Sequence, residues 1–346
     1  MKSKIFVFLI IAAFIFSAIA FAFSTRASAK NGSELAALLP ASDIVVTFDA
    51  QKTFNTALPQ VLSANQEMLD KINGKIDSLK TKIGIDARQF EQFAVGAKTK
   101  QISASKTEVE PFILARGAFN SAQLVTAAKL FSKGKYKEEK IGSRTVYIFK
   151  ISDIAPQNKQ QTSDSFFDKM IDKLLNSISD EIAVTTFDNN TLAFGTAARV
   201  REAFTNEKSR VSAEVLALAT RNPNAVINFG GKMPKGAGVL LPLDNDELGK
   251  TIDSINQFSG SLDIAGGKTN LFVMAKTLKP EDAEMLFDTM DALKTLGKVF
   301  LGGNKNADKQ VYARMLENAN ITRSGTEVSL ALEVPQSDLD IIVGKK

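Results

Sequence analysis

Apolar residues recur along this chain with two different spacings, which predict strands and helices in alternation. Short apolar runs bounded by turn residues are typical of β-strands. The predicted strands are 43–49, 92–98, 111–118 and 224–231, together with four hairpins that turn at Gly142-Ser143, Asn189-Asn190, Gly266-Gly267 and Ser324-Gly325. Asn189 and Asn190 suit a tight turn because asparagine tolerates a positive φ.

Apolar residues that lie three and four positions apart predict the helices. The longest predicted helix runs from about 60 to 83, and Gly84 is suited to end it. Its apolar stripe consists of Leu62, Leu69, Ile72, Ile76, Leu79 and Ile83. The stripe could form a coiled coil or pack on the protein's own sheet, and Gly74 favours the sheet because glycine weakens a lone helix. Further helices are predicted at 120–131, 165–178, 197–204, 246–258 and 307–318, near 211, and from Pro280 onward.

The two halves of the pattern resemble each other. "DIVVTFDA" corresponds to "NAVINFGG", and "IAVTTFDNNTLAFGT" corresponds to "NITRSGTEVSLALEV". Between these segments, each half has a pair of strands that leads into a helix. The sequence therefore predicts an α+β fold of two related antiparallel-sheet units, 36–206 and 211–346, with helices packed on one face. One continuous sheet and two facing sheets both fit this pattern.

Residues 1–29 have the layout of a secretory signal. Two lysines precede the uncharged run 5–23, and Ala27 and Ala29 are the small residues that a signal peptidase requires, so that Lys30 would begin the mature chain. A retained anchor is the alternative, because about 20 apolar residues can span a bilayer. Membrane contact would then be made only through 5–23. Both interpretations export the rest of the chain, as a periplasmic or extracellular protein or as one anchored in the inner membrane.

The sequence of 346 residues contains no cysteine and no histidine. This excludes thiolate nucleophiles, disulfides, Cys/His zinc sites, haem held by histidine and the Ser-His-Asp triad. Catalysis would have to use carboxylate pairs, Ser-Lys arrangements, tyrosine or a carboxylate-bound metal. The formal charge of +5 includes three positive charges of the leader, and the other charges are mixed along the chain. Nucleic-acid binding is therefore not predicted.

Two short motifs resemble a phosphate-binding loop and a calcium loop, but each lacks residues that such a loop requires. "GGKT" at 266–269 has Leu262 where a phosphate-binding loop needs glycine, and a strand-like segment follows, so a hairpin turn is favoured. "DNDELG" at 244–249 begins like a calcium loop, but Leu248 and Ile255 replace two oxygen ligands. Carboxylates near predicted strand ends are Asp49, Asp86, Asp188 and Asp263. Turn roles explain them as well as catalysis does, so we predict no catalytic residue, cofactor or metal.

The predicted helix 165–178 has a dense apolar side opposite a mixed-charge side. We call the apolar side the candidate partner-contact face; it consists of Phe166, Phe167, Met170, Ile171, Leu174, Leu175 and Ile178. A helix docked on the core would explain this face. A movable lid or a partner-binding helix is the alternative, because a polar segment, 155–165, precedes it.

The order of the segments resembles a group of exported bacterial proteins. The likeness rests on "LLPASDIVVTFDA", "IGIDARQFEQFAVGAK" and "DNNTLAFGTAARVREAF", and it extends over 36–206. Exported α+β proteins in families known only as domains of unknown function are similar in this order. The resemblance implies a location in the bacterial envelope, and it brings no catalytic residue with it.

These observations predict an exported envelope protein that acts as a non-enzymatic binding or scaffolding module. Its partner would be an unidentified envelope protein or ligand. One alternative is a carboxylate- or Ser/Lys-based hydrolase of envelope polymers, which a deep cleft with two acids of raised pKa would favour. The other is a membrane-tethered accessory subunit, which an exposed partner-contact face would favour.

Overall fold

The computed structural model describes residues 32–84, 86–103, 106–150, 181–206, 208–234, 246–302 and 306–344. Two sequence-based predictions lie outside these residues. They are the leader, with Ala27, Ala29 and Lys30 at its expected cleavage site, and the partner-contact face Phe166, Phe167, Met170, Ile171, Leu174, Leu175 and Ile178. Within the described ranges, no helix is long and apolar enough to cross a membrane.

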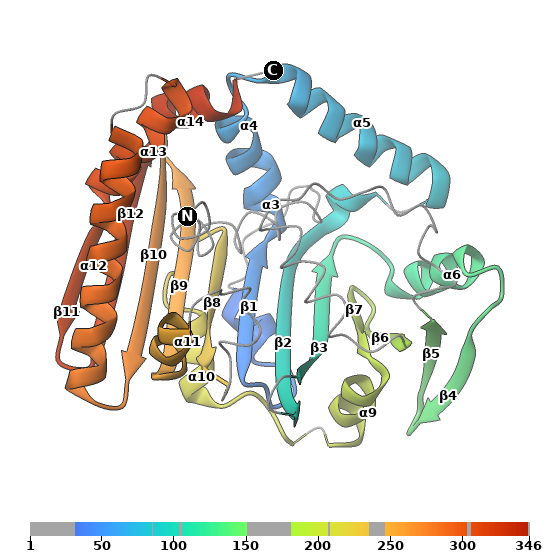
Figure 1. Cartoon of the computed structure of the whole chain (residues 1–346). Helices are drawn as coiled ribbons and strands as arrows, with labels where there is room; N and C mark the ends of the chain where they lie inside the picture. The colour runs from blue at the N-terminus through green and yellow to red at the C-terminus, as the bar shows by residue number, and fades with distance from the viewer. Residues whose placement is uncertain are drawn as a thin grey trace.

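The described strands form one continuous antiparallel sheet (Figure 1). In chain order they are β1 Ile44–Asp49, β2 Phe90–Ser103, β3 Lys106–Gly117, β4 Lys137–Ile141, β5 Arg144–Lys150, β6 Glu181–Asp188, β7 Thr191–Thr196, β8 Ile227–Lys232, β9 Ile255–Ala265, β10 Lys268–Thr277, β11 Asn320–Ser324 and β12 Glu327–Pro335. Across the sheet the order is β11-β12-β10-β9-β8-β1-β2-β3-β7-β6-β5-β4. The expected α+β class is confirmed, and of the two arrangements left open the single sheet is the one observed.

The strand order is the same on both sides of the sheet's centre. From β1 outward the strands are β2, β3, β7 and β6, and from β8 outward they are β9, β10, β12 and β11. The hairpin β4–β5 is added at the outer end of the first unit. At the centre, Thr47 of β1 pairs with Asn228 of β8. These two residues occupy the same place in the matched segments "DIVVTFDA" and "NAVINFGG", as a local two-fold axis between β1 and β8 requires.

Helices connect these strands. The described ones are α2 Gly32–Ala36, α3 Ala50–Lys52, α4 Leu58–Val61, α5 Gln66–Ile83, α6 Ser121–Phe131, α9 Ala197–Thr205, α10 Ala213–Ala219, α11 Asp246–Asp253, α12 Pro280–Gly302, α13 Ala307–Asn318 and α14 Gln336–Val343, with a π-helical turn at Thr53–Ala57 and a 3-10 turn at Ala87–Gln89. Pro280 opens α12 as expected, and Asn120 caps α6 through hydrogen bonds from the N–H groups of Ala122 and Gln123.

The helices cover both faces of the sheet, whereas the sequence predicted helices on one face only. Neighbouring residues of a strand point to opposite faces. Val45 belongs to a first core with residues of α2, α9 and α10. Phe48 belongs to a second core with residues of α4 and α14, against which Met290 of α12 and Met315 of α13 pack. The physical reason lies in β1 itself, whose consecutive apolar residues need cover on both sides.

The long predicted helix is shorter than expected. It begins at Gln66, because the side chain of Asn65 accepts a hydrogen bond from the N–H of Met68 and so forms the N-cap. Gly84 ends it in the left-handed conformation, as predicted. Leu69 and Ile72 pack against the second core, which favours packing of the stripe within the protein over the coiled coil.

Three local predictions need correction. The helix expected over 246–258 ends at Asp253, because 255–258 join strand β9. The hairpin at Asn189-Asn190 is present without a positive φ at either residue, and the Asp188 side chain accepts a hydrogen bond from the Asn190 N–H instead. The last hairpin turns one residue later than expected, because β11 still contains Ser324.

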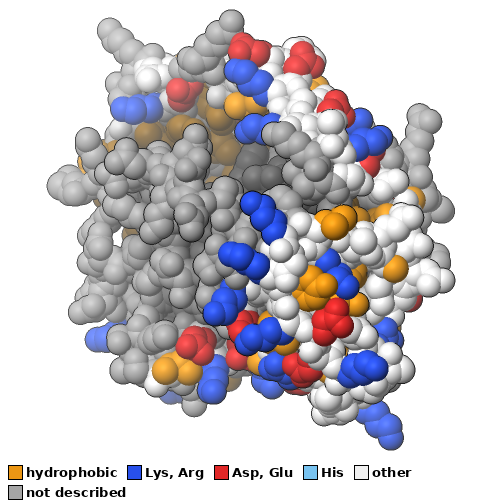
Figure 2. All heavy atoms as spheres, turned by 90° about the vertical axis from the view of Figure 1, so that its right-hand side faces the viewer, with side chains coloured by type: hydrophobic (Ala, Val, Ile, Leu, Met, Phe, Trp, Pro, Cys, Tyr) orange, Lys and Arg blue, Asp and Glu red, His pale blue; other side chains and the backbone are white. Residues whose placement is uncertain are grey.

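The outer edge at β4 is strongly charged. The strand has the sequence KEEKI, with Lys and Glu at its first four positions. Charged residues on an edge strand hinder pairing with another chain. On the face shown in Figure 2, Lys and Arg side chains lie among Asp and Glu side chains.

Candidate functional site

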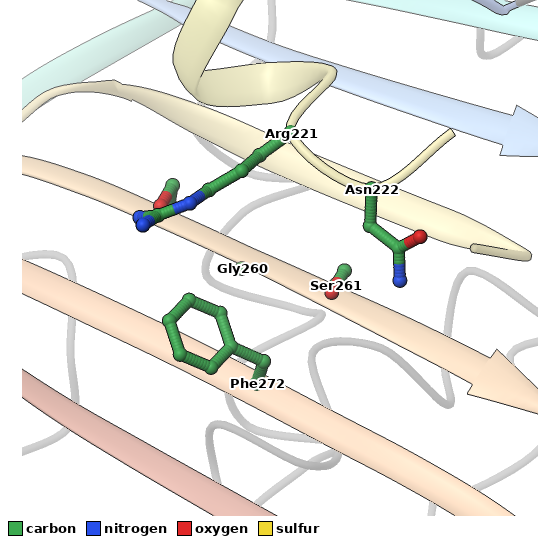
Figure 3. Close-up of a pocket in the computed structure, with 6 residues that line it drawn as sticks. Arg221, Asn222, Gly260, Ser261 and Phe272 are labelled. Carbon is green, nitrogen blue, oxygen red and sulfur yellow. The ribbon is translucent and has the colours of Figure 1, made fainter. Parts of the chain in front are cut away.

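A cavity of about 330 Å³ lies between the segment that follows α10 and strands β9 and β10 (Figure 3). It is lined by Arg221, Asn222, Ser259, Gly260, Ser261 and Phe272. In Figure 3 the side chain of Arg221 reaches across β9 toward Phe272 on β10, while Asn222 and Ser261 lie together farther along β9. None of the described lining residues is acidic.

The two units differ in which helix covers the face of the sheet that carries the cavity. In the first unit, α9 follows β7 and covers this face, where Phe204 packs edge-on against Phe112. In the second unit, α14 follows β12 but contacts α4, and its Leu339 belongs to the second core on the opposite face. The described part of the second unit therefore has no counterpart of α9 over β9 and β10, and the cavity lies on that face.

Side-chain alternation along β9 separates core from cavity. Leu262 and Ile264 point into the second core, whereas Ser259 and Ser261 point to the other face. Their partners across the strand pair are Met274 and Phe272. The segment "SGSLDIA" thus carries small polar residues on one side of a strand whose other side is apolar.

Two glycines allow the elements around the cavity to approach closely. A Cβ on Gly230 would lie 2.6 Å from the backbone carbon of Leu218, so glycine lets α10 rest directly on β8. A Cβ on Gly260 would lie 2.2 Å from the ring of Phe229, which crosses the strand on the second-core face. The close contact at Gly230 brings the end of α10 over the sheet, from where Arg221 extends over the cavity.

The short segment after α10 is held in place by side-chain hydrogen bonds. The amide of Asn228 accepts from the N–H of Asn222 at 3.2 Å and donates to its carbonyl at 2.8 Å. The side chain of Asn222 accepts from the N–H of Asn224 at 3.1 Å. Lys52 donates to the carbonyl of Asn224. These contacts fix the backbone beside Arg221 before any ligand is present.

The cation of the cavity is Arg221. Its side chain is exposed, and its guanidinium carbon lies 5.3 Å from the centre of the Phe272 ring. This distance is within the range of a cation–π interaction. The contact places the guanidinium over the Phe272 ring of β10.

The polar groups below it are hydroxyls. Ser259 is fully buried, and within the described part of the chain its Oγ has no hydrogen-bond partner. Ser261 is 6% exposed. A buried hydroxyl without a partner costs free energy unless something else supplies the hydrogen bond. No base lies among the described lining residues; these residues can bind polar groups, and they do not themselves include the base that a serine nucleophile needs.

The carboxylates singled out from the sequence lie elsewhere. Asp86 caps the turn at Ala87–Gln89 and lies 2.9 Å from Lys80, and Asp188 supports a hairpin turn. Only Asp49 and Asp263 share a partner. Lys52 lies 2.6 Å from an oxygen of Asp263, and its N–H donates to the Asp49 cap oxygen. Neither acid lines the cavity.

Asp49 has a raised pKa. Burial disfavours its charged form, and the hydrogen bonds and positive charge of Lys52 offset this in part. Since Asp49 and Asp263 both lie outside the described lining, they do not place two acids in this cavity. Within the described ranges, no group of three acidic residues could hold a metal ion either.

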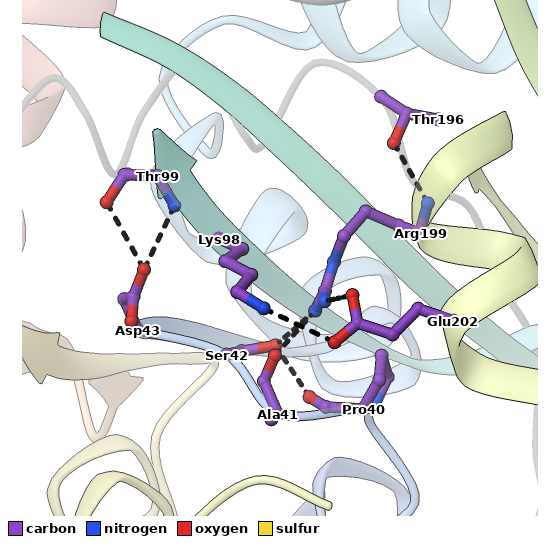
Figure 4. Close-up of polar contacts among 9 residues, drawn as sticks. All are labelled: Pro40, Ala41, Ser42, Asp43, Lys98, Thr99, Thr196, Arg199 and Glu202. Atoms are coloured by element: carbon purple, nitrogen blue, oxygen red, sulfur yellow. Dashed lines mark hydrogen bonds and ion pairs between the residues drawn. The ribbon is translucent and has the colours of Figure 1, made fainter. Parts of the chain in front are cut away.

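A second polar cluster surrounds Arg199 of α9 (Figure 4). Its guanidinium is fully buried, pairs with Glu202, and donates to the Ala41 carbonyl at 2.8 Å and to Ser42 Oγ at 3.0 Å. Lys98 of β2 also reaches Glu202, at 3.4 Å. The cluster ties α9 to the segment before β1, so we assign it a structural role.

No side chain of the cavity was predicted from the sequence. Arg221 follows a short helix and Phe272 occupies an ordinary strand position, so neither has a local signature. The one available signal was Ser259 and Ser261 on the same side of a buried strand. The "GGKT" prediction was correct, because Gly266 and Gly267 form the turn between β9 and β10 with φ of 61° and 74°.

Comparison with known proteins gives a distant likeness only. No family model matches the sequence, and no curated protein matches it. Among solved structures, crystal form I of a protein called TP0453 is similar over 92% of this chain and 98% of that chain, with 11% identity and a TM-score of 0.41. Crystal form IV has 8% identity and a TM-score of 0.40. A likeness this weak carries no functional argument.

Proposed function

We propose that the chain is an exported, non-enzymatic binding module of the bacterial envelope, and that its ligand occupies the cavity beside α10. The observation that carries the proposal is the buried hydroxyl of Ser259, a residue of the cavity lining, which has no partner among the described residues. Folded proteins rarely leave a buried polar atom unsatisfied. A ligand that accepts or donates a hydrogen bond there would remove this cost.

The hydrolase alternative receives less support. A serine nucleophile needs an adjacent base, and none of the described residues that line the cavity with Ser259 and Ser261 is a lysine or a carboxylate. The lysine of this region, Lys52, is occupied by Asp263 and by a backbone carbonyl. The location in the envelope is proposed from the leader and from the resemblance to exported bacterial proteins.

Export is tested by expressing the full chain in a bacterium, fractionating the cells and measuring the intact mass of the product. We expect a soluble exported species that begins at Lys30. A membrane-bound species that retains 5–23 would instead indicate the tethered subunit, and crosslinking to neighbouring envelope proteins would be the next step. A cytoplasmic species with its leader intact would contradict the proposal.

Ligand binding is tested on the exported protein by native mass spectrometry of the freshly purified chain. A bound small molecule is expected in the wild type and in Ser329→Leu. It should be absent from Ser261→Leu, which fills the cavity. Ser329 is the matched control because it lies on the same face of the sheet, opposite Met274, but does not line the cavity. Equal occupancy in both variants would exclude the cavity as the binding site.

A further inference from the structure

We propose that the cavity recognises the oxyanion of a small ligand, a carboxylate or a phosphate, with Arg221 as its cation and Ser259 and Ser261 as hydrogen-bond donors. The inference rests on the proposed binding function and narrows it to one chemical class. It is carried by three features of the described residues: the charge of Arg221, the unsatisfied Ser259 hydroxyl and the lack of negative charge around them.

The guanidinium is pre-positioned for an anion. Among the described residues, the interaction that places Arg221 is the contact with the Phe272 ring, and no carboxylate pairs with it. Because no carboxylate among the described residues pairs with Arg221, its planar fork of N–H donors is available to a ligand. Such a fork matches two oxygens of a carboxylate or phosphate. The fixed segment Asn222–Asn224 reduces the ordering that binding would require.

The hydroxyls complete the donor set. Ser259 is fully buried on β9, and Ser261 lies two residues further along the same face. A serine hydroxyl can donate one hydrogen bond. A hydrogen bond to an ionised acceptor is stronger than one between neutral groups. Because the Ser259 hydroxyl has no accessible surface, an oxyanion under Arg221 reaches it after a local shift of the side chains above it. The oxyanion would then satisfy this hydroxyl and gain more from it than a neutral oxygen would.

The neighbouring charges do not oppose an anion. The nearest acid along β9 on this face is Asp263, two residues beyond Ser261, and Lys52 neutralises it at 2.6 Å. The cavity volume of about 330 Å³ lies at the lower end of the range for small-molecule sites. The ligand is thus a small carboxylate or phosphate compound rather than a polymer.

The test follows the methyl group of Met274 by NMR, in full mature protein labelled at methionine methyls. Met274 is buried and lies opposite Ser259 on β10, so it reports on the cavity, and Met315 near the second core serves as the internal reference. The probes are sodium phosphate, sodium acetate and sodium citrate, with sodium chloride added to keep the ionic strength constant. Comparing phosphate with acetate and citrate shows which of the two kinds of oxyanion binds.

We expect at least one of these anions to shift Met274 saturably while Met315 stays in place. Arg221→Gln should weaken that binding about tenfold, the loss typical for a hydrogen bond to a charged group. Arg323→Gln is the matched control, because Arg323 is an arginine of edge strand β11 that pairs with Glu284. Ser259→Ala should also weaken binding but leave the chain folded, since it removes an unsatisfied group.

Three outcomes would overturn the inference. Equal losses in Arg221→Gln and Arg323→Gln would show general attraction of anions to the surface. A saturable Met274 shift with neutral sugars but not with anions would refute the oxyanion while leaving the binding module intact. No Met274 response to anions or to neutral sugars, together with an empty cavity in native mass spectra, would count against both proposals.

Discussion

Arg199 is a charged side chain with no exposed surface, and its partners explain how the fold tolerates it. Glu202 neutralises the guanidinium, and Ala41 and Ser42 accept hydrogen bonds from its second nitrogen. Since both acceptors precede β1, the arginine joins the end of the first unit to its beginning. Removing one member of a buried ion pair is strongly destabilising because the remaining groups lose their partner.

We expect Arg199→Ala to lower the free energy of unfolding by about 3 kcal/mol, the lower end for a broken buried pair, since Glu202 keeps Lys98 nearby. Arg201 is the matched control on the same helix. It makes a bidentate pair with Glu139 at the surface, and Arg201→Ala should cost less than about 1 kcal/mol. Urea unfolding followed by circular dichroism measures both. Similar losses would mean that the buried network contributes no more than a surface pair.

Asp49 gives a prediction about pH. Its pKa is raised chiefly by burial, despite the contacts with Lys52. A carboxyl with a raised pKa in the folded state stabilises the fold when protonated, and this contribution is lost as the pH rises through that pKa. The ionised Asp49 therefore costs stability at neutral pH. Asparagine removes the charge but keeps the capping oxygen for the Lys52 N–H.

Asp49→Asn should consequently be more stable than the wild type at pH 7. The advantage should shrink as the pH falls through the folded-state pKa toward the ordinary value of 3.8. Urea unfolding at a series of pH values measures it. An advantage that grows in acid would show that the carboxylate is instead stabilised by Lys52.

At the scale of elements, the turn residues of this chain determine where its hairpins turn. Gly266 and Gly267 both have positive φ, which a two-residue turn of type I′ requires. We expect Gly266→Asn to leave stability nearly unchanged, because asparagine tolerates this conformation. Gly266→Val should cost about 2 kcal/mol, because a β-branched residue does not.

Gly74 is a helical glycine whose replacement should change stability in the opposite direction. It lies within α5 with no atom near the position of a Cβ, so Gly74→Ala should raise stability by about 0.5–1 kcal/mol. Differential scanning calorimetry of the three variants tests the whole set. A Gly266→Val protein as stable as wild type would mean that the β9–β10 turn is free to change its conformation.

The elements that were predictable are those whose cause is local. Gly84, Asn120 and Pro280 mark helix ends through their own backbone chemistry, and the hairpin positions followed from turn residues. What could not be predicted depends on distant packing. Residues 255–258 have a helix-compatible pattern, but Phe258 pairs with Gly231 and Ala275 in the sheet. The covering of both faces likewise depends on where α9 and α14 settle after their strands.

The cavity likewise depends on packing between residues that are distant in the sequence. It exists because α14 packs on α4 instead of on the face of β9 and β10. No pattern within α14 distinguishes these two positions, since its apolar side could cover either face. Ser259 and Ser261 mark the uncovered face in the sequence. However, serines also alternate with apolar residues on strands that simply face solvent, so this pair alone does not predict a cavity.

For the whole molecule, the central question is whether the two units behave as separate domains. The described contacts argue for a single cooperative structure. β1 and β8 pair directly, and the first core combines Val45 of one unit with Val215 and Ala219 of the other. The connecting segment also pairs with the start of the first unit, where the Val211 N–H donates to the Leu39 carbonyl at 3.1 Å.

We therefore expect β3 and β10, one strand from each unit, to become exposed in the same global unfolding step. Native-state hydrogen exchange, read by mass spectrometry at increasing urea, should give peptides from both strands the same opening free energy and the same urea dependence. Peptides from α5 should open at lower free energy, because most of that helix is exposed. If β10 opened in a separate step with a smaller urea dependence, 211–346 would be an independent domain. The β1–β8 pair would then be an interface between two domains, and the cavity beside α10 would lie next to a hinge.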